Sequence, residues 1–211
     1  DEDTLYYPSN YYYSDGTFDD AAMRNNSMAV GKQVADESSV LLWNDNGALP
    51  LSEGDKVGFF GIGAQRSRYM YTGTGSGQLT YSGDDDIMSE LNARGINVNS
   101  NLWRIYTLLT ASYGWGGVSA SSAGVNDRNY GEYTIKEAPW SAIEDIDNST
   151  FGGAVLANYA GYKDAAIMLI SRNGGEDRDV NFDPDGDNNL DGTYLDLSEA
   201  EADVLAHLDV L

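Results

Sequence analysis

The chain has 211 residues, of which 41% are hydrophobic, and it contains 15 tyrosines and 4 tryptophans, a composition typical of a globular protein with one sizeable core. Its 34 acidic and 12 basic residues give a formal net charge of -22, which disfavours nucleic acid and anionic membrane surfaces as partners. The absence of cysteine excludes disulfides and thiolate metal sites, and no apolar run reaches the roughly 20 residues that span a bilayer.

The N-terminal part predicts an arm followed by a helix. Residues 1–20 are polar and rich in tyrosine without a sustained hydrophobic period, which is typical of an extended arm lying on another surface. An acidic start and spaced apolar residues predict a helix over 21–38, and a short extended piece follows over 40–43. We therefore divide the chain into an N-terminal arm and lead-in helix over 1–33 and a domain over 34–211.

A buried strand followed by a glycine-bearing loop is predicted next. The apolar run over 56–61 indicates the strand, and the loop carries alternating glycines, Gly73, Gly75 and Gly77. Such glycines either let the backbone approach a ligand closely or make a flexible turn. Two glycines of a dinucleotide-binding fingerprint follow the strand, but Arg66 takes the place of the third, so dinucleotide binding ranks last among the alternatives.

Two helices and a short strand follow the glycine run. The acidic run 84–86 caps a helix that Gly95 closes, and a strand over 96–98 comes directly after it. The amphipathic pattern over 100–114 predicts the second helix. Residues 114–131 are a low-complexity loop rich in glycine and serine, either an insertion at the rim of a site or a plain surface loop.

The C-terminal part predicts one more strand and one more helix. The continuous apolar pattern over 165–170 indicates a strand buried on both faces, and Ser198 with Glu201 forms a capping box that begins the last helix. The alternation of helices and strands indicates an α/β fold, with a mainly parallel sheet sandwiched by helices. About three strands are predicted where such sheets usually have five or six, so the domain is expected to be incomplete in this chain.

A carboxylate flanked by two arginines follows the last predicted strand. Glu176 lies in "SRNGGEDRD", residues 171–179, after a Gly-Gly hinge and between Arg172 and Arg178. Ligand sites in open α/β sheets form at the carboxyl ends of strands, where such a group can be pushed into a partly desolvated cleft. The two arginines would lower the pKa of Glu176 unless they bind the neighbouring aspartates instead. A solvated salt bridge in a surface loop is the alternative.

Three stretches together resemble the second, α/β-sandwich domain of glycoside hydrolase family 3, and their order and spacing also match it. They are "VADESSVLLWNDNGALPLSEGDKVGFFG" at 34–61, "TGTGSG" at 72–77, and "ISRNGGEDRD" at 170–179 with "YLDLSEAEADVL" at 194–205. The resemblance implies a retaining, exo-acting β-glycosidase, similar to β-glucosidases, that hydrolyses terminal non-reducing sugars from β-glycosides. In that family the site lies between this domain and a TIM-like barrel domain, which supplies an aspartate nucleophile.

The resemblance also assigns roles within the acidic loop. Glu176 corresponds to the general acid/base of the family, and Arg172, Asp177 and Arg178 are its supporting neighbours. Family members often have glycine directly after the glutamate, where this chain has Asp177, so the match is incomplete there. Retaining cleavage needs a second carboxyl group about 5–5.5 Å away as nucleophile. The barrel that would supply it is absent from this chain, so the chain alone is expected to be inactive.

The other candidate site residues would bind the sugar. We predict that the sugar is contacted by backbone N–H groups of the glycine run and by the two arginines before it. One tryptophan could stack on a sugar face. These residues are Gly73, Gly75, Ser76, Gly77, Arg66, Arg68 and Trp115. For each of them a plain turn or surface role is the alternative. We expect a carbohydrate substrate and an extracellular or cell-surface location, with a cytoplasmic location left open.

A calcium site is the one cofactor alternative. Asp187, Asn189 and Asp191 match the start of an EF-hand loop, but the bidentate acid should fall at Ser198, and the glutamate comes one residue later, at Glu199. An acidic surface loop fits this pattern better, and no cofactor is expected. The rival functions are therefore a non-catalytic carbohydrate-binding module and a calcium-stabilised interaction module.

Overall fold

The computed structural model divides the chain into two compact units, Asp1–Leu49 and Pro50–Leu211. The domain boundary expected after residue 33 stays a prediction. The residues that the structure describes are 11–13, 15–45, 47–65, 86–115, 135–170, 195–208 and 211. In this part of the chain no helix combines the length and the apolar character that crossing a membrane requires.

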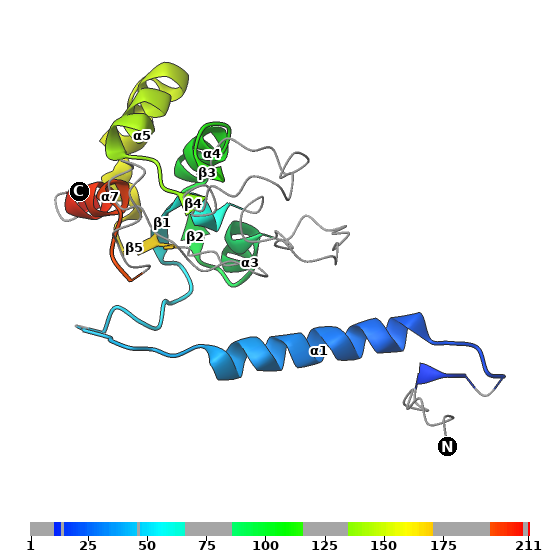
Figure 1. The fold of residues 1–211 in the computed structure, drawn as a ribbon. Helices are drawn as coiled ribbons and strands as arrows, with labels where there is room; N and C mark the ends of the chain where they lie inside the picture. The colour runs from blue at the N-terminus through cyan, green and yellow to red at the C-terminus, as the bar shows by residue number, and fades with distance from the viewer. Residues whose placement is uncertain are drawn as a thin grey trace. The chain divides into compact units, whose positions relative to one another are not determined.

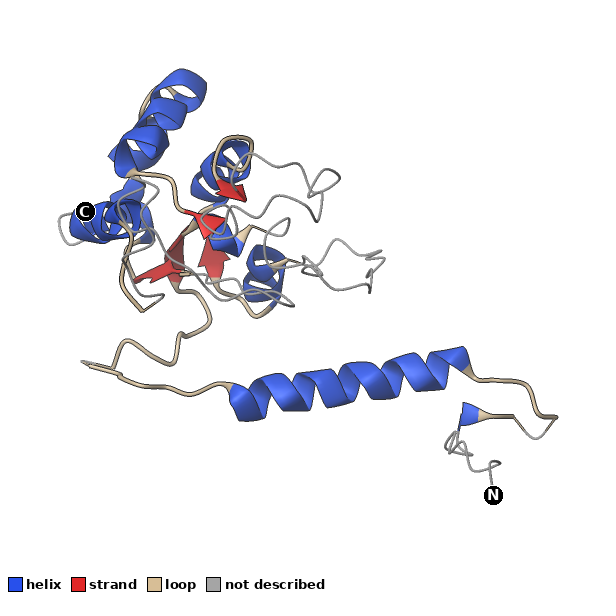
Figure 2. Ribbon diagram, viewed as in Figure 1, coloured by secondary structure: helices blue, strands red, loops and turns tan. Residues whose placement is uncertain are grey.

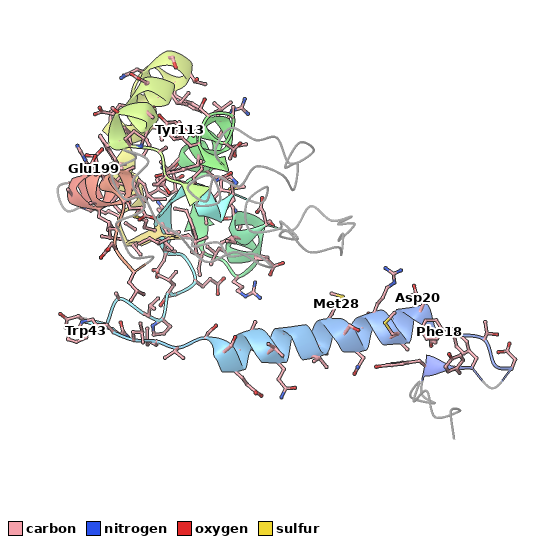
Figure 3. All side chains as sticks on the ribbon, in the orientation of Figure 1. Phe18, Asp20, Met28, Trp43, Tyr113 and Glu199 are labelled. Carbon is pink, nitrogen blue, oxygen red and sulfur yellow. The ribbon has the colours of Figure 1, made fainter. Side chains whose placement is uncertain are left out.

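The first unit is built around one helix, α1 (Asp20–Ser38), which confirms the helix predicted there. Asp19 caps it, because its carboxylate accepts a hydrogen bond from the Ala22 N–H at 2.9 Å. None of the residues of α1 is buried. Residues 39–45 form neither helix nor strand, and Trp43, which Figure 3 shows on the coil beyond α1, is 79% exposed.

The second unit contains a three-stranded parallel sheet in the order β2-β1-β5, which confirms the predicted α/β fold (Figures 1 and 2). Its strands are β1 (Lys56–Phe60), β2 (Asn97–Val98) and β5 (Ala165–Met168), and both neighbours run parallel to β1. A separate antiparallel ribbon pairs β3 (Gly114–Trp115) with β4 (Ile135–Lys136). The first two residues of the predicted Gly/Ser-rich loop are therefore strand.

Helices cover both faces of the sheet. α3 (Ile87–Ala93) lies on one side, α5 (Trp140–Ile146) and α7 (Glu199–Leu208) lie on the other, and α4 (Ser100–Leu109) contributes side chains to both (Figure 1). The structure confirms the helix predicted before Gly95, the amphipathic helix after it and the last helix. The helix α5 was not predicted.

The side chains of β1 alternate between two hydrophobic clusters. Val57 and Phe59 are buried with Trp103 on the face covered by α3, whereas Phe60 is buried with Tyr106 on the face covered by α5 and α7. The ring centroids are 5.6 Å apart for Phe59 and Trp103 and 6.2 Å apart for Phe60 and Tyr106, both edge-to-face. β1 is therefore the buried central strand that its apolar pattern predicts.

The prediction that the strand over 165–170 is buried on both faces is wrong. β5 pairs with β1 on one side, and among the described residues no strand pairs with its other side. Its residues are accordingly half-buried or exposed, and Ile170 beyond its end is 41% exposed. The apolar run still packs, since Ile167 and Met168 lie against opposite clusters.

Three short helical segments that were not predicted follow α5. They are the π-helical turn η4 (Asp147–Phe151), α6 (Ala154–Ala157) and η5 (Tyr159–Tyr162). Asp147 is 1% exposed, and its carboxylate accepts hydrogen bonds from two N–H groups in the first turn of α6 at 3.1 and 2.9 Å. This buried carboxylate therefore ties η4 to the helix that follows it.

The capping box predicted at the start of α7 is confirmed. The Ser198 N–H donates to the Glu201 carboxylate at 2.8 Å, and the Glu201 N–H donates to the Ser198 hydroxyl at 3.2 Å. Asp203 on the same helix accepts a hydrogen bond from the Trp140 N–H at 2.9 Å, at the start of α5. α7 therefore also caps its neighbour, which joins the two helices.

Candidate functional site

The two segments that carry most of the predicted site residues begin at neighbouring strand ends. β1 leads through Gly61 into the segment 66–85, and β5 leads into the segment 171–194. The Leu169 N–H donates to the Phe60 carbonyl at 3.0 Å, which extends the pairing of the two strands to their carboxyl ends. The strand ends that lead toward the two segments therefore lie side by side.

The order of the strands places these ends at a topological switch point. The chain passes from β1 to β2 on one side of it and later to β5 on the other side (Figure 1). In open α/β sheets, ligand crevices form outside the carboxyl ends of the strands where the strand order reverses in this way. The carboxyl edge between β1 and β5 is thus the place where this fold favours a ligand site.

Gly61 allows the two backbones to approach each other at this edge. Its φ of +101° and ψ of 124° form a conformation that residues with side chains rarely adopt. A Cβ atom at this position would lie 2.4 Å from the Leu169 carbonyl oxygen, so only glycine fits beside β5. The short helix η2 (Ile62–Ala64) follows at once, and all of its residues are buried.

A buried carboxyl group that sequence reasoning missed holds the start of η2. Glu137 directly follows β4 and is 7% exposed. Its Oε2 accepts a hydrogen bond from the Ile62 N–H at 2.7 Å, and its Oε1 accepts one from the Ala138 N–H at 3.0 Å. Burial raises the pKa of Glu137 to about 7. The two N–H groups oppose this shift, and the charge of Glu201 adds to it.

Tyr106 lies beside this carboxyl group in the same core. Burial raises the pKa of Tyr106 well above its usual value, the Glu137 charge raises it further, and the backbone of Gly61 offsets part of the effect. Tyr106 and Glu137 are therefore both buried near the carboxyl end of β1. The one sequence signal of Glu137 is an acid that precedes the apolar residues of "KEAPW", which does not distinguish a buried carboxyl group from an exposed one.

The geometry of Glu137 is that of an anchor. A carboxyl group with a pKa near 7 could exchange a proton at neutral pH, as a general acid or base must. However, each of its oxygens accepts a hydrogen bond from a backbone N–H group of its own chain. Glu137 is therefore arranged to hold the backbone after β1.

Of the predicted site residues, Trp115 lies in the described part of the chain, where its backbone pairs with Ile135 in the β3–β4 ribbon. The others lie outside the described residues, and their roles stay predictions. They are Arg66, Arg68, Gly73, Gly75, Ser76, Gly77, Arg172, Glu176, Asp177 and Arg178, together with the calcium candidates Asp187, Asn189 and Asp191. Within the described ranges, no three acidic or histidine side chains gather in a way that could hold a metal ion.

Comparison with protein families identifies the family of this domain. The family model described as the glycosyl hydrolase family 3 C-terminal domain matches residues 39–209, which is most of the chain. Comparisons with curated proteins and with solved structures give no match. The family model spans β1, β5 and both segments that start at their carboxyl ends. The chain therefore belongs to the glycosyl hydrolase family 3 C-terminal domain family.

Proposed function

We propose that this chain is part of a retaining, exo-acting β-glycosidase, similar to a β-glucosidase, that hydrolyses terminal non-reducing sugars from β-glycosides. Membership of the family supports a glycosidase-related role and implies association with an N-terminal catalytic domain. One structural observation supports the proposal further. The strands that lead toward the segments with Glu176 and the glycine run, β5 and β1, pair with each other as far as their carboxyl ends.

In the proposed reaction Glu176 acts first as an acid and then as a base. Its proton passes to the glycosidic oxygen as the C–O bond breaks, while an aspartate of the catalytic domain attacks the anomeric carbon and forms a glycosyl ester. Glu176, now ionised, takes a proton from the water that hydrolyses this ester, which returns both carboxyl groups to their starting states. The negative charge of the nucleophile would raise the pKa of Glu176 enough for the first step.

The other proposed site residues either support Glu176 or bind the sugar. The neighbouring charges would fix the position of the Glu176 loop. The glycine run would donate backbone N–H groups to sugar hydroxyls, the arginines before it would donate side-chain N–H groups, and the tryptophan would stack on a sugar face. The charges next to Glu176 are those of Arg172, Asp177 and Arg178. The glycine run comprises Gly73, Gly75, Ser76 and Gly77, the arginines before it are Arg66 and Arg68, and the tryptophan is Trp115.

The proposal is tested by hydrolysis of a panel of aryl β-glycosides by the full-length enzyme and its Glu176→Ala variant, with and without azide. We expect the variant to lose about 10²–10⁴-fold in kcat/KM on substrates with poor leaving groups, the usual contribution of general acid–base catalysis. The loss should be smallest for good leaving groups, which need little protonation. Azide should restore part of the turnover, because it attacks the glycosyl ester without a general base.

A matched control is Glu144→Ala, which removes an exposed glutamate from α5 and should leave the kinetics unchanged. Unchanged activity of Glu176→Ala would assign the acid/base role to another group. A folded wild-type enzyme that hydrolyses no β-glycoside, yet binds sugars, would favour the non-catalytic binding module instead.

A further inference from the structure

We propose that Glu137 is a positioning residue of the candidate site, which fixes the backbone from which the segment with the glycine run departs. The inference rests on the proposed function for what that segment binds. The anchoring itself does not depend on the nature of the ligand. Glu137 is far from the segment in sequence, since 75 residues separate it from Ile62, so the link is made by the fold.

The start of the segment is held at three points by three different elements. Gly61 lies against the Leu169 carbonyl oxygen after β5. The Ile62 N–H, one of the groups that a helix start leaves without an intrahelical partner, donates to Glu137 after β4. Gln65, which is 4% exposed, accepts a hydrogen bond from the Thr107 hydroxyl of α4 at 2.9 Å.

These contacts hold the last described residues before the segment 66–85. The three residues of η2 between them are buried, so the backbone cannot shift without disturbing the core. Any group that follows Gln65 therefore departs from a fixed point in the core. A rigid starting point is what a binding loop needs if its N–H groups are to meet sugar hydroxyls at hydrogen-bond distance.

Burying a carboxylate to hold this backbone costs desolvation free energy, which argues for a role beyond stability. Glu137 is buried, and the neighbouring charge that acts on it is the acid Glu201 rather than a base. Its two oxygens hold two N–H groups at once, one after β1 and one after β4. A neutral glutamine of the same shape could accept only one of these hydrogen bonds, because its NH₂ group would face the second N–H.

The test compares the full-length enzyme with its Glu137→Gln variant in two measurements. Hydrogen exchange followed by mass spectrometry should show faster exchange at the Ile62 amide or the Ala138 amide in the variant, whichever loses its acceptor. Steady-state kinetics on aryl β-glycosides should show KM raised by about tenfold or more, the value of one charge-assisted hydrogen bond. The kcat value should fall less, because the change lies next to the segment proposed to bind the sugar and not next to the segment that carries Glu176.

Glu144→Gln, on the exposed surface of α5, is the control for loss of one negative charge and should change neither quantity. Unchanged exchange at both amides in a folded Glu137→Gln variant would refute the anchoring. Faster exchange with unchanged KM would refute the positioning role. If the wild-type enzyme hydrolyses no glycoside, the proposed function fails, while the exchange measurement still decides whether Glu137 anchors the segment.

A second variant keeps the test decisive if Glu137→Gln does not fold. Glu137→Asp retains the charge and shortens the side chain by one methylene, so the carboxylate can no longer reach both N–H groups. Smaller changes of the same sign in exchange and in KM are expected. A folded Glu137→Asp enzyme with the exchange and KM of the wild type would overturn the proposal.

Discussion

Replacing Gly61 by alanine tests whether the two strand ends meet as closely as the structure indicates. The new Cβ would lie 2.4 Å from the Leu169 carbonyl oxygen and 3.1 Å from the carbon and nitrogen of the same residue. All three atoms belong to the backbone that directly follows β5, so no side-chain rotation can relieve the contact. The residue would also have to hold a φ of +101°, which an alanine strongly resists.

The expected cost follows from these two effects. Holding a non-glycine residue in such a conformation costs about 1–3 kcal/mol, and displacing packed backbone costs about 1–3 kcal/mol more. The hydrogen bond from the Leu169 N–H to the Phe60 carbonyl would lengthen as the strands separate, which adds about 1 kcal/mol. We therefore expect Gly61→Ala to lower the free energy of unfolding by about 3–6 kcal/mol, a large part of the 5–15 kcal/mol that holds a typical domain.

The assay is urea unfolding of the full chain, followed by tryptophan fluorescence, since Trp103 and Trp140 are buried in this unit. Gly152→Ala is the matched control, because Gly152 also has a positive φ, +64°, but nothing lies within 4 Å of an added Cβ. That variant should cost about 1–2 kcal/mol from conformation alone. If Gly61→Ala costs no more than Gly152→Ala, the Leu169 carbonyl does not constrain this position, and the reasoning about adjoining strand ends fails.

Three further predictions concern polar side chains that hold the backbone. Burial raises the pKa of Glu137 from 4.5 to about 7, so its contribution to stability is fully present below pH 4.5 and is lost as the pH rises to 7. Between pH 5 and pH 8, wild type should lose on the order of 3 kcal/mol of unfolding free energy relative to Glu137→Gln, and parallel pH curves from urea unfolding would contradict this. Asp147→Ala leaves two N–H groups of α6 without their acceptor and should cost about 2–4 kcal/mol in the same assay, whereas Asp145→Ala on the exposed face of α5 should cost under about 0.5 kcal/mol. Ser198→Ala removes one half of the capping box and should lower the unfolding free energy by about 1 kcal/mol, and a variant as stable as the wild type would show that the box contributes nothing.

The elements that sequence predicts best are those whose signals are local. Asp86 accepts a hydrogen bond from the Ser89 N–H at the start of α3, and Gly95 closes the helix with a φ of +79°. The type and position of each residue are enough to predict its role, and the same holds for the Ser198 capping box. β1 was equally clear, because its apolar residues are bounded by turn-forming sequence on both sides.

The elements that sequence misses depend on distant partners. α5 begins after Pro139, which offers no side-chain cap, and the Trp140 N–H finds its acceptor in Asp203 of α7. The turn at Asp147 is likewise held by hydrogen bonds to the next helix. The apolar run over 165–170 overestimates the burial of β5, because this burial also depends on distant partners. An apolar run shows that a strand can be buried, but its position at the edge of the described sheet decides whether it is.

Some features of the candidate site are likewise visible in the local sequence, whereas others depend on distant parts of the chain. Glu176 and the glycine run stand out in the sequence by composition, but composition does not bring two segments about 100 residues apart to one place. The order β2-β1-β5 places the ends of the two strands that lead toward them side by side at one edge of the sheet. At that edge a glycine and a buried carboxyl group, Gly61 and Glu137, hold consecutive backbone positions. Because both act on the same few residues, a change at either should alter where the glycine run departs without touching a residue that binds substrate.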